Sequence, residues 1–238
     1  MSDPRDDGKG RPTARSGGAE ARGRARRQSQ ARILEAAEAV FAASGYDGAT
    51  TAEIARRAGL PKANVHYYFA TKEAIYRAVI DRTLKLWLSA FEPLGAEDDP
   101  AEALSAYVRA KMRHSREHPL ASRIFAREML AGAPVVRDFL ETELRSWVRT
   151  KSAVLRGWAE RGLMDPVDPP QLFFMIWAVT QTYADFDAQI CAVLDKPRQT
   201  QRDFETATET VLKVLLEGCG VRRAAPAQAA STRVRAAS

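Results

Sequence analysis

Apolar residues recur every three or four positions between residues 27 and 219, the spacing of one face of an α-helix, and β-type alternation is absent. Ile33, Ala37, Val40 and Phe41 form one such stripe. The pattern predicts an all-α fold of about nine helices, with ends uncertain by several residues. The expected helices span residues 27–44, 51–58, 62–68, 72–93, 100–117, 119–131, 134–161, 169–186 and 200–219.

Capping residues stand at the expected helix starts. Thr50 with Glu53 fits a capping box, and Thr71 precedes the helix that starts at residue 72. Asp-Pro pairs at 99–100 and 168–169 combine an N-cap with a proline at the first helical position. Glycines 45, 59, 132 and 162 fall where helices should end.

Charge and helical pattern together divide the chain into four parts. Residues 1–27 carry a net charge of +4 and the last 18 residues another +4, so the middle of the chain is slightly acidic. We expect a disordered basic arm at 1–25 and a disordered tail at 221–238, because neither has apolar periodicity. Between them, we expect a small helical head at 26–71 and a larger helical body at 72–220.

Composition excludes several protein classes. Apolar residues make up 45% of the chain, enough for a core. The two cysteines have no metal-ligand spacing and fit a reducing cytoplasm. No signal peptide is expected, and the apolar run at 173–179 is too short to span a bilayer. No catalytic triad, phosphate-binding loop or dinucleotide fingerprint is present, so neither an enzyme nor a cofactor is expected.

The stretch TTAEIARRAGLPKANVHYYF, residues 50–69, predicts two short helices joined by a tight turn at glycine. This is a helix-turn-helix, whose second helix can enter the major groove of DNA. Its polar side chains suit base edges and phosphates, whereas Phe69 should face the core. The expected DNA contacts are Thr51, Lys62, Asn64, His66, Tyr67, Tyr68 and Lys72. The basic segment at 22–27 could also reach DNA or stay solvated.

Residues 28–76 resemble the DNA-binding domain of TetR-family repressors. The shared features are Phe-x-x-x-Gly-Tyr from Phe41, Thr-Thr-x-x-Ile-Ala from Thr50 and Tyr-Tyr-Phe-x-x-Lys-Glu from Tyr67. Pro61 and His66 stand where serine and tyrosine are usual in the family, which affects operator preference. The resemblance implies a homodimer, formed through the last two helices, on a near-palindromic operator.

The body resembles the members of this family that regulate pyrimidine utilisation. The segments that carry the resemblance are SREHPLASRIFAREMLAGAPVV, KSAVLRGWAERGLMDPVDP and LFFMIWAVTQTYADFDAQI. It covers residues 30–219 and implies an effector such as uracil or thymine, whose binding releases the operator. Through the linking helix at 72–93, the effector would change the spacing of the DNA-binding heads.

A flat nucleobase requires an aromatic wall and a few convergent polar groups in an apolar cavity. Trp177, Thr180 and Gln181 fall on one stripe of the helix at 169–186, and an amide can donate and accept at once. The same stripe could equally be core or dimer interface. Further candidates for the effector site are Asp185, Lys111, Ser115 and Trp158, while Arg123 and Glu128 are expected to form a structural ion pair.

Two alternatives remain open from sequence. The regulator could respond to a drug or another metabolite, because the head does not report the effector. It could also be an architectural DNA binder without a ligand, although the large body makes that less economical. His114 and His118 stand at i, i+4, a metal-compatible spacing, but no third ligand accompanies them, so no metal site is expected.

Overall fold

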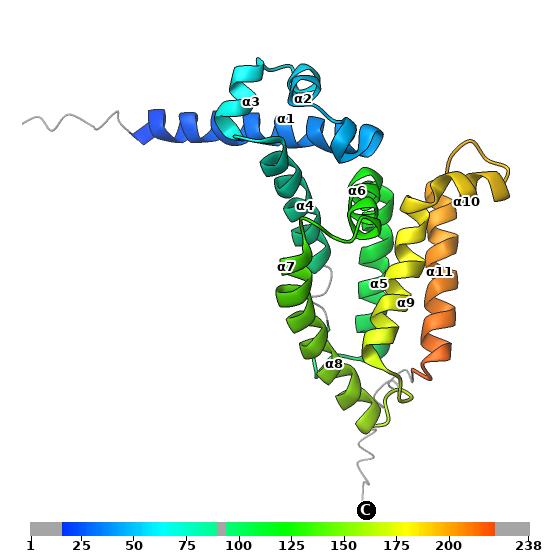
Figure 1. Ribbon diagram of the computed structural model, residues 1–238. Helices are drawn as coiled ribbons and strands as arrows, with labels where there is room; N and C mark the ends of the chain where they lie inside the picture. The colour runs from blue at the N-terminus through cyan, green and yellow to red at the C-terminus, as the bar shows by residue number, and fades with distance from the viewer. Residues whose placement is uncertain (1–15, 90–93, 222–238) are drawn as a thin grey trace, which may run out of the picture. The chain divides into compact units, whose positions relative to one another are not determined.

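The structure, a computed structural model, describes residues 16–89 and 94–221, with side chains from residue 23 onward. Every regular element in these ranges is a helix, so the predicted all-α fold is confirmed (Figure 1). The described residues form two compact units that divide after Ile75. Helix α4 (Lys72–Ser89) begins in the first unit and continues into the second.

The N-terminal unit is built from α1 (Ser16–Gly48), α2 (Thr51–Ala58), α3 (Lys62–Tyr68) and the first turn of α4. α2 packs on both α1 and α3. Apolar side chains from all four helices meet in a small core and are almost completely buried: Ile33, Phe41, Ile54, Val65 and Ile75. The helical spacing read from the sequence therefore identifies the correct faces.

Helix α1 departs from the prediction at its start. It begins at Ser16, so residues 16–25 are helical and the expected disorder of that part of the arm is wrong; residues 1–15 lie outside the described chain. Alanine, glutamate and arginine, all strong helix formers, dominate residues 19–27 and outweigh the glycine among them. Regular helical geometry stops at Gly45, whose φ of 70° and ψ of 179° place a break one residue beyond the predicted end.

The second unit contains the rest of α4 and seven further α-helices with one π-helical turn. These are α5 (Pro100–Glu117), α6 (Pro119–Leu130), α7 (Arg137–Phe139), η1 (Leu140–Leu144), α8 (Arg145–Glu160), α9 (Pro169–Asp185), α10 (Asp187–Val193) and α11 (Gln201–Gly218). Helix α5 packs against both α9 and α11, and α9 also packs against α6 and α8. The core of this unit includes Tyr107, Trp158 and Phe173.

Two segments of the body differ from the prediction. The single helix expected at 134–161 is divided into α7, η1 and α8, because residues 140–144 adopt π-helical hydrogen bonding. Residues 187–193 form an extra short helix, α10, after Phe186 leaves helical geometry with a φ of −113°. Apolar periodicity reports neither a widened turn nor a break of one residue.

The expected N-caps are present, but the Thr50–Glu53 capping box is only half formed, because the Glu53 carboxylate pairs with Arg56 at 2.6 Å. The hydroxyls or carboxylates of Thr50, Thr71, Asp99 and Asp168 accept hydrogen bonds from the backbone N–H three residues later, at 2.9–3.2 Å. Thr200 and Asp203 add a reciprocal capping box at the start of α11. Each cap satisfies an N–H that the helix leaves unpaired.

The residues before α5 are fixed to helix α8 by side-chain hydrogen bonds. Lys151 donates to the carbonyl of Leu94, and Trp158 Nε1 donates to the carbonyl of Ala96 at 3.1 Å. No described helix is long and apolar enough to cross a membrane. Apart from Val221, the predicted tail at 221–238 lies outside the described residues.

Candidate DNA-binding surface and effector cavity

The turn between α2 and α3 is fixed by its backbone. Gly59 adopts the left-handed conformation, with φ 62° and ψ 38°, and the N–H of Leu60 returns to the carbonyl of Ala55 at 3.0 Å. Arg32 of α1 donates to the carbonyl of Ala58 at 2.6 Å, which satisfies a free carbonyl at the end of α2. These contacts hold α3 at a set angle to α2.

Helix α3 presents nearly all of its side chains to solvent. Val65 is its one buried residue, whereas Lys62, Asn64 and His66 are exposed. Tyr67 is 75% exposed, an unusual state for a large aromatic side chain, and its ring meets that of Tyr68 edge-on at 5.1 Å. A polar, aromatic face on the second helix of a helix-turn-helix is suited to DNA contact.

Residues next to α3 differ in their exposure to solvent. Thr51 is half-buried in the first turn of α2, and Thr50 caps that helix. Phe69 was expected in the core, but it is only half-buried at the end of α3. Arg57, exposed on the last turn of α2, is a further cation that is not among the predicted contacts.

Lys72 has partners inside the head. Its ammonium donates to the carbonyls of Tyr46 at 2.7 Å and Ala49 at 3.1 Å, and it lies 4.4 Å from the ring centre of Tyr46. These carbonyls follow the break at Gly45, so the lysine joins the end of α1 to the start of α4. The geometry gives Lys72 a role in the fold of the head, whereas the prediction gave it a phosphate contact.

The body holds a cavity of about 210 Å³ between α4, α5, α6, α9 and the α7–η1 segment. Its wall is almost entirely apolar, with one ammonium and one amide. The lining residues are Leu84, Trp87, Leu88, Lys111, Phe125, Met129, Phe139, Leu140, Leu144, Trp177 and Gln181. The volume lies below the roughly 300–1,000 Å³ typical of pockets for drug-sized ligands. The cavity therefore suits a small molecule.

Lys111 is the only charged residue in this wall. It is 3% exposed, and its ammonium lies over the ring of Trp87, 4.3 Å from the ring centre. Burial lowers the pKa of Lys111 to about 7, and the opposing attraction of Asp185 is the smaller effect. Trp87 in turn meets Phe125 edge-on at 4.6 Å.

Trp177 and Gln181 stand one turn apart on α9. The indole Nε1 of Trp177 donates to the hydroxyl of Tyr107 at 2.6 Å, so the residue offers the cavity its ring and keeps its N–H elsewhere. Gln181 is half-buried, and among the described residues its amide makes no hydrogen bond. The amide is therefore free to hydrogen-bond a molecule in the cavity.

Four other predicted effector contacts lie outside the cavity wall. The Thr180 hydroxyl donates back to the carbonyl of Ile176, and Ser115 donates to the carbonyl of Thr180 at 2.8 Å. Trp158 is bound to Ala96, as described above. Asp185 accepts from Ser122 Oγ at 2.6 Å. The structure thus brings together Lys111, Trp177 and Gln181.

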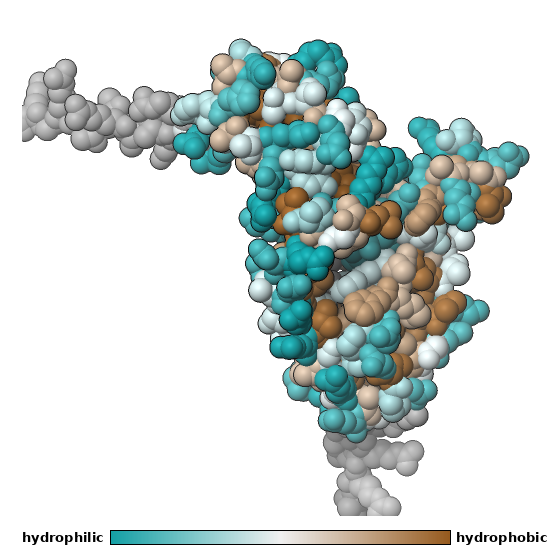
Figure 2. All heavy atoms as spheres, in the orientation of Figure 1, coloured by the Kyte–Doolittle hydropathy of each residue, from teal (hydrophilic) through white to brown (hydrophobic). Residues whose placement is uncertain are grey.

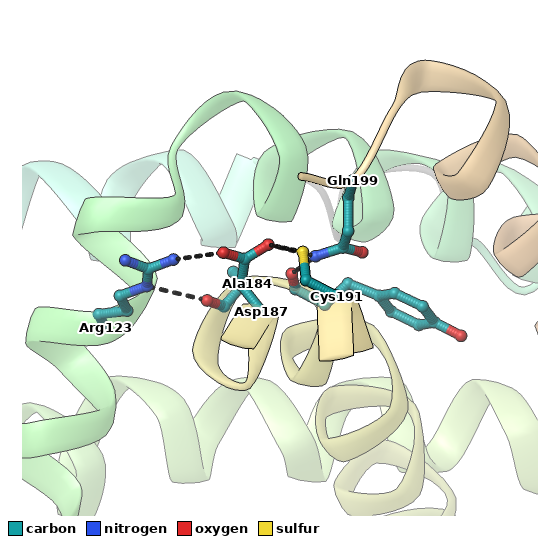
Figure 3. Close-up of polar contacts among 6 residues, drawn as sticks. Arg123, Ala184, Asp187, Cys191 and Gln199 are labelled. Atoms are coloured by element: carbon teal, nitrogen blue, oxygen red, sulfur yellow. Dashed lines mark hydrogen bonds and ion pairs between the residues drawn. The ribbon is translucent and has the colours of Figure 1, made fainter. Parts of the chain in front are cut away.

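The expected ion pair between Arg123 and Glu128 is wrong. Arg123 donates to the carbonyl of Ala184 at 3.0 Å and pairs with Asp187 at 3.5 Å (Figure 3). Asp187 also accepts from Gln199 at 2.8 Å. Arg123 and Glu128 are five positions apart on α6, a spacing that points their side chains in different directions.

Glu128 instead closes the end of its own helix. Its carboxylate accepts from the backbone N–H of Val135 at 2.6 Å and from the hydroxyl of Tyr76 at 3.1 Å. The donors are neutral, but together they satisfy a carboxylate that is 3% exposed.

His114 and His118 lie with ring centres 6.2 Å apart, and the described residues contain no cluster of three or more potential metal ligands. Burial lowers the pKa of His114 to about 4. Sequence reasoning missed Trp87, Phe125 and Met129 as cavity residues, because their spacing equally suits a filled core. The one available signal was Lys111, a charge on an otherwise apolar helical face.

One unit with an exposed helix-turn-helix and a second helical unit with a small cavity are together typical of DNA-binding regulators controlled by small molecules. Residues 33–79 match the family described as "Bacterial regulatory proteins, tetR family", and residues 80–222 match "YcdC-like protein, C-terminal region". The chain belongs to the TetR family and is a ligand-responsive transcriptional regulator.

This chain is similar in sequence and in fold to known transcriptional regulators. The HTH-type transcriptional regulator RutR of Escherichia coli is 41% identical over 186 residues, which cover 78% of this chain and 88% of RutR. A transcriptional regulator from Streptomyces coelicolor superimposes with a TM-score of 0.65 at 25% identity, over 82% of this chain and 99% of that one. AibR, solved with isovaleryl coenzyme A and operator DNA, shares the fold at 20% identity, with a TM-score of 0.64 and coverage of 78% and 97%.

Proposed function

We propose that the protein is a homodimeric repressor of genes for pyrimidine catabolism and related nitrogen metabolism, released from a near-palindromic operator by uracil or thymine. The observation that carries the proposal is the convergence of Lys111, Trp177 and Gln181 on one small apolar cavity. The similarity to RutR along most of both chains supports the same effector class.

The polar groups of the cavity match one edge of uracil. That edge presents two carbonyl oxygens on either side of an N–H. The amide of Gln181 can accept from the N–H and donate to one carbonyl, while the ammonium of Lys111 donates to the other. Cytosine has an amino group in place of one carbonyl and lacks this N–H, so it would present a donor to the ammonium. Uracil should therefore bind and cytosine should not.

The apolar part of the wall suits the rest of the base. The rings of Trp177 and Trp87 offer flat surfaces, and the leucine side chains leave no partner for further polar groups. A methyl group at C5 adds only apolar surface, which explains why thymine would share the site. The small cavity volume disfavours nucleosides and larger effectors.

For the DNA-binding surface, we propose that α3 enters the major groove. Asn64, His66 and Tyr67 are exposed on it and would reach base edges. Lys62 and Tyr68 would contact phosphates, together with Thr51 at the start of α2. Lys72 is the exception, because its ammonium is held by carbonyls of the head.

Dimerisation through α9 and α11 is supported by apolar side chains on their outer faces. Phe174 is 50% exposed and Val214 66% exposed, whereas Leu212 and Leu215 of α11 face the core. Figure 2 shows hydrophobic surface over this side of the body. A twofold dimer would place two copies of α3 in successive major grooves.

The coupling would run along α4. Leu84 and Trp87 of this helix line the cavity, and its first turn carries Lys72 and Ile75 in the head. A ligand that changes the packing of Trp87 would therefore shift α4 and the spacing of the two heads. Such coupling free energies are typically about 1–3 kcal/mol.

A thermal-unfolding screen with uracil, thymine and cytosine tests the effector. Uracil and thymine should raise the melting temperature, and cytosine should not. A ligand at a hundred times its Kd stabilises the folded protein by about 2.7 kcal/mol. Gln181→Leu should lose the uracil response. The matched control is Gln171→Leu, on an exposed position of the same helix, which should retain it.

The second half of the test uses DNA. A duplex selected by the protein from a randomised pool should be a near-palindrome and should be released on addition of uracil. If neither uracil nor thymine stabilises the protein while another metabolite does and releases the duplex, the effector assignment is wrong and the regulator has a different input.

A further inference from the structure

Lys111 is a buried charge whose compensation is incomplete. Among the described residues its ammonium makes no hydrogen bond, and its contact is the face of the Trp87 ring. Glu128, the other buried charged side chain among the described residues, receives hydrogen bonds from Tyr76, Val135 and Val136. The Nζ atom is not one of the fully buried atoms without a partner, so it keeps access to the cavity. A ligand atom of opposite charge there would pair with an ammonium that burial otherwise penalises.

The surrounding charges do not supply that partner. Asp185 attracts Lys111, but its carboxylate is hydrogen-bonded to Ser122 and is not part of the cavity wall. On α5 itself, His114 lies one turn away, and burial lowers its pKa to about 4, so it is neutral near pH 7. The other residues lining the cavity, on α4, α6, α7, η1 and α9, are all uncharged.

We infer that Lys111 makes the effector site select the anionic form of an acidic heterocycle, a cyclic imide that has lost its N–H proton. The inference rests on the proposed function, namely that this cavity holds a pyrimidine. The bound state is an ion pair of ammonium and ring anion. If Lys111 starts as the neutral amine, it takes up the imide proton and no proton is released. If Lys111 starts protonated, the imide proton passes to solvent and one proton is released on binding.

The remaining polar group accommodates the anion. Gln181 can rotate its amide to present the N–H₂ group to a ring nitrogen that has become an acceptor. The apolar wall strengthens the ion pair, because water does not screen it. A site with this preference would bind an acidic pyrimidine more tightly than a less acidic one of the same shape. Contacts to the neutral base alone would not separate the two.

A series of ligands with matched shape and graded acidity provides the test. Uracil, 5-fluorouracil and 5-nitrouracil differ at one position and become more acidic in that order. Calorimetric titration near pH 8 should show tighter binding along the series, by on the order of tenfold between uracil and 5-fluorouracil. In Lys111→Met the gradient should disappear, whereas Lys85→Met, at an exposed position on α4, should keep it.

Absorption spectra give an independent readout with the unaltered protein. Deprotonated 5-nitrouracil absorbs at longer wavelengths than the protein. Its ionisation midpoint should fall by about one pH unit or more on binding, since a neighbouring cation favours the anion. Equal affinities for all three ligands, an unshifted midpoint, or a gradient that survives in Lys111→Met would overturn the inference while the proposed function stands. If none of the three binds, both are wrong.

Discussion

The indole Nε1 of Trp177 donates a 2.6 Å hydrogen bond to the hydroxyl of Tyr107, which joins α9 to α5 at the edge of the cavity in the body. Tyr107 is fully buried, and Trp177 is half-buried. The bond fixes the plane of the indole ring. Because the ring is a wall of the cavity, its orientation affects both stability and ligand binding.

Replacing Tyr107 by phenylalanine should therefore destabilise the protein. The indole N–H would lose this acceptor, at a cost of about 1–3 kcal/mol. Urea denaturation measures the loss, and titration with uracil should show weaker binding. Tyr67→Phe is the control, since that side chain is exposed and should leave both quantities unchanged. Unaltered stability in Tyr107→Phe would show that the hydrogen bond contributes little.

Lys72→Met should weaken the head. Its ammonium holds the carbonyls of Tyr46 and Ala49, and charge-assisted hydrogen bonds contribute about 1.5–3 kcal/mol each at most. Hydrogen exchange should become faster at the end of α1 and the start of α4. If exchange is unaffected while DNA affinity falls with a reduced salt slope, Lys72 contacts phosphate as the sequence predicted.

Lys62→Met should weaken DNA binding without changing stability. The side chain is exposed at the start of α3, so the free energy of unfolding should stay the same within experimental error. Loss of one phosphate contact should weaken binding to all DNA sequences alike and lower the salt slope by about 1. A change in base preference, measured by repeating the duplex selection, would contradict this role.

The buried charge of Lys111 makes stability depend on pH. In the unfolded chain the lysine keeps its proton up to its ordinary pKa of 10.5, whereas in the folded protein the pKa is about 7. Between these values the unfolded state binds more protons, so stability rises with pH, and the full cost of the charge is present below pH 7. Lys111→Met should remove a cost of at most a few kcal/mol.

Denaturation of both proteins near pH 6 and near pH 10 measures the effect. The free energy of unfolding of Lys111→Met should exceed that of the wild type most at the lower pH. The two free energies should converge at the higher pH. Lys85→Met should show no such convergence, because the residue is exposed. A constant difference at both pH values would mean that Lys111 does not titrate in this range.

The sequence predicted best what depends on neighbouring residues. Thr50 and Asp99 cap their helices because the groups involved lie three residues apart. The polar residues of α3 were likewise expected to face solvent, and Lys62, Asn64 and His66 are exposed. Such features need no knowledge of the rest of the fold.

Long-range features escaped sequence reasoning for physical reasons. Lys72 looked like a DNA contact, because the carbonyls that it binds lie more than twenty residues away. Trp87 and Phe125 looked like core residues, since a cavity arises only when helices meet without filling the space between them. Of the predicted effector contacts, Trp158 proved to bind the backbone before α5 instead.

The π-helical turn at Leu140–Leu144 gives the cavity wall an unusual sensitivity to chain length. A π turn contains one residue more than an α turn, and each residue of a helix rotates its successor by about 100°. Deleting one residue here would restore regular α-helix and change which side chains of the α7–η1 segment face the cavity. If the cavity holds the effector as proposed, insertions and deletions, rather than substitutions, provide a short route to a new effector on an unchanged scaffold.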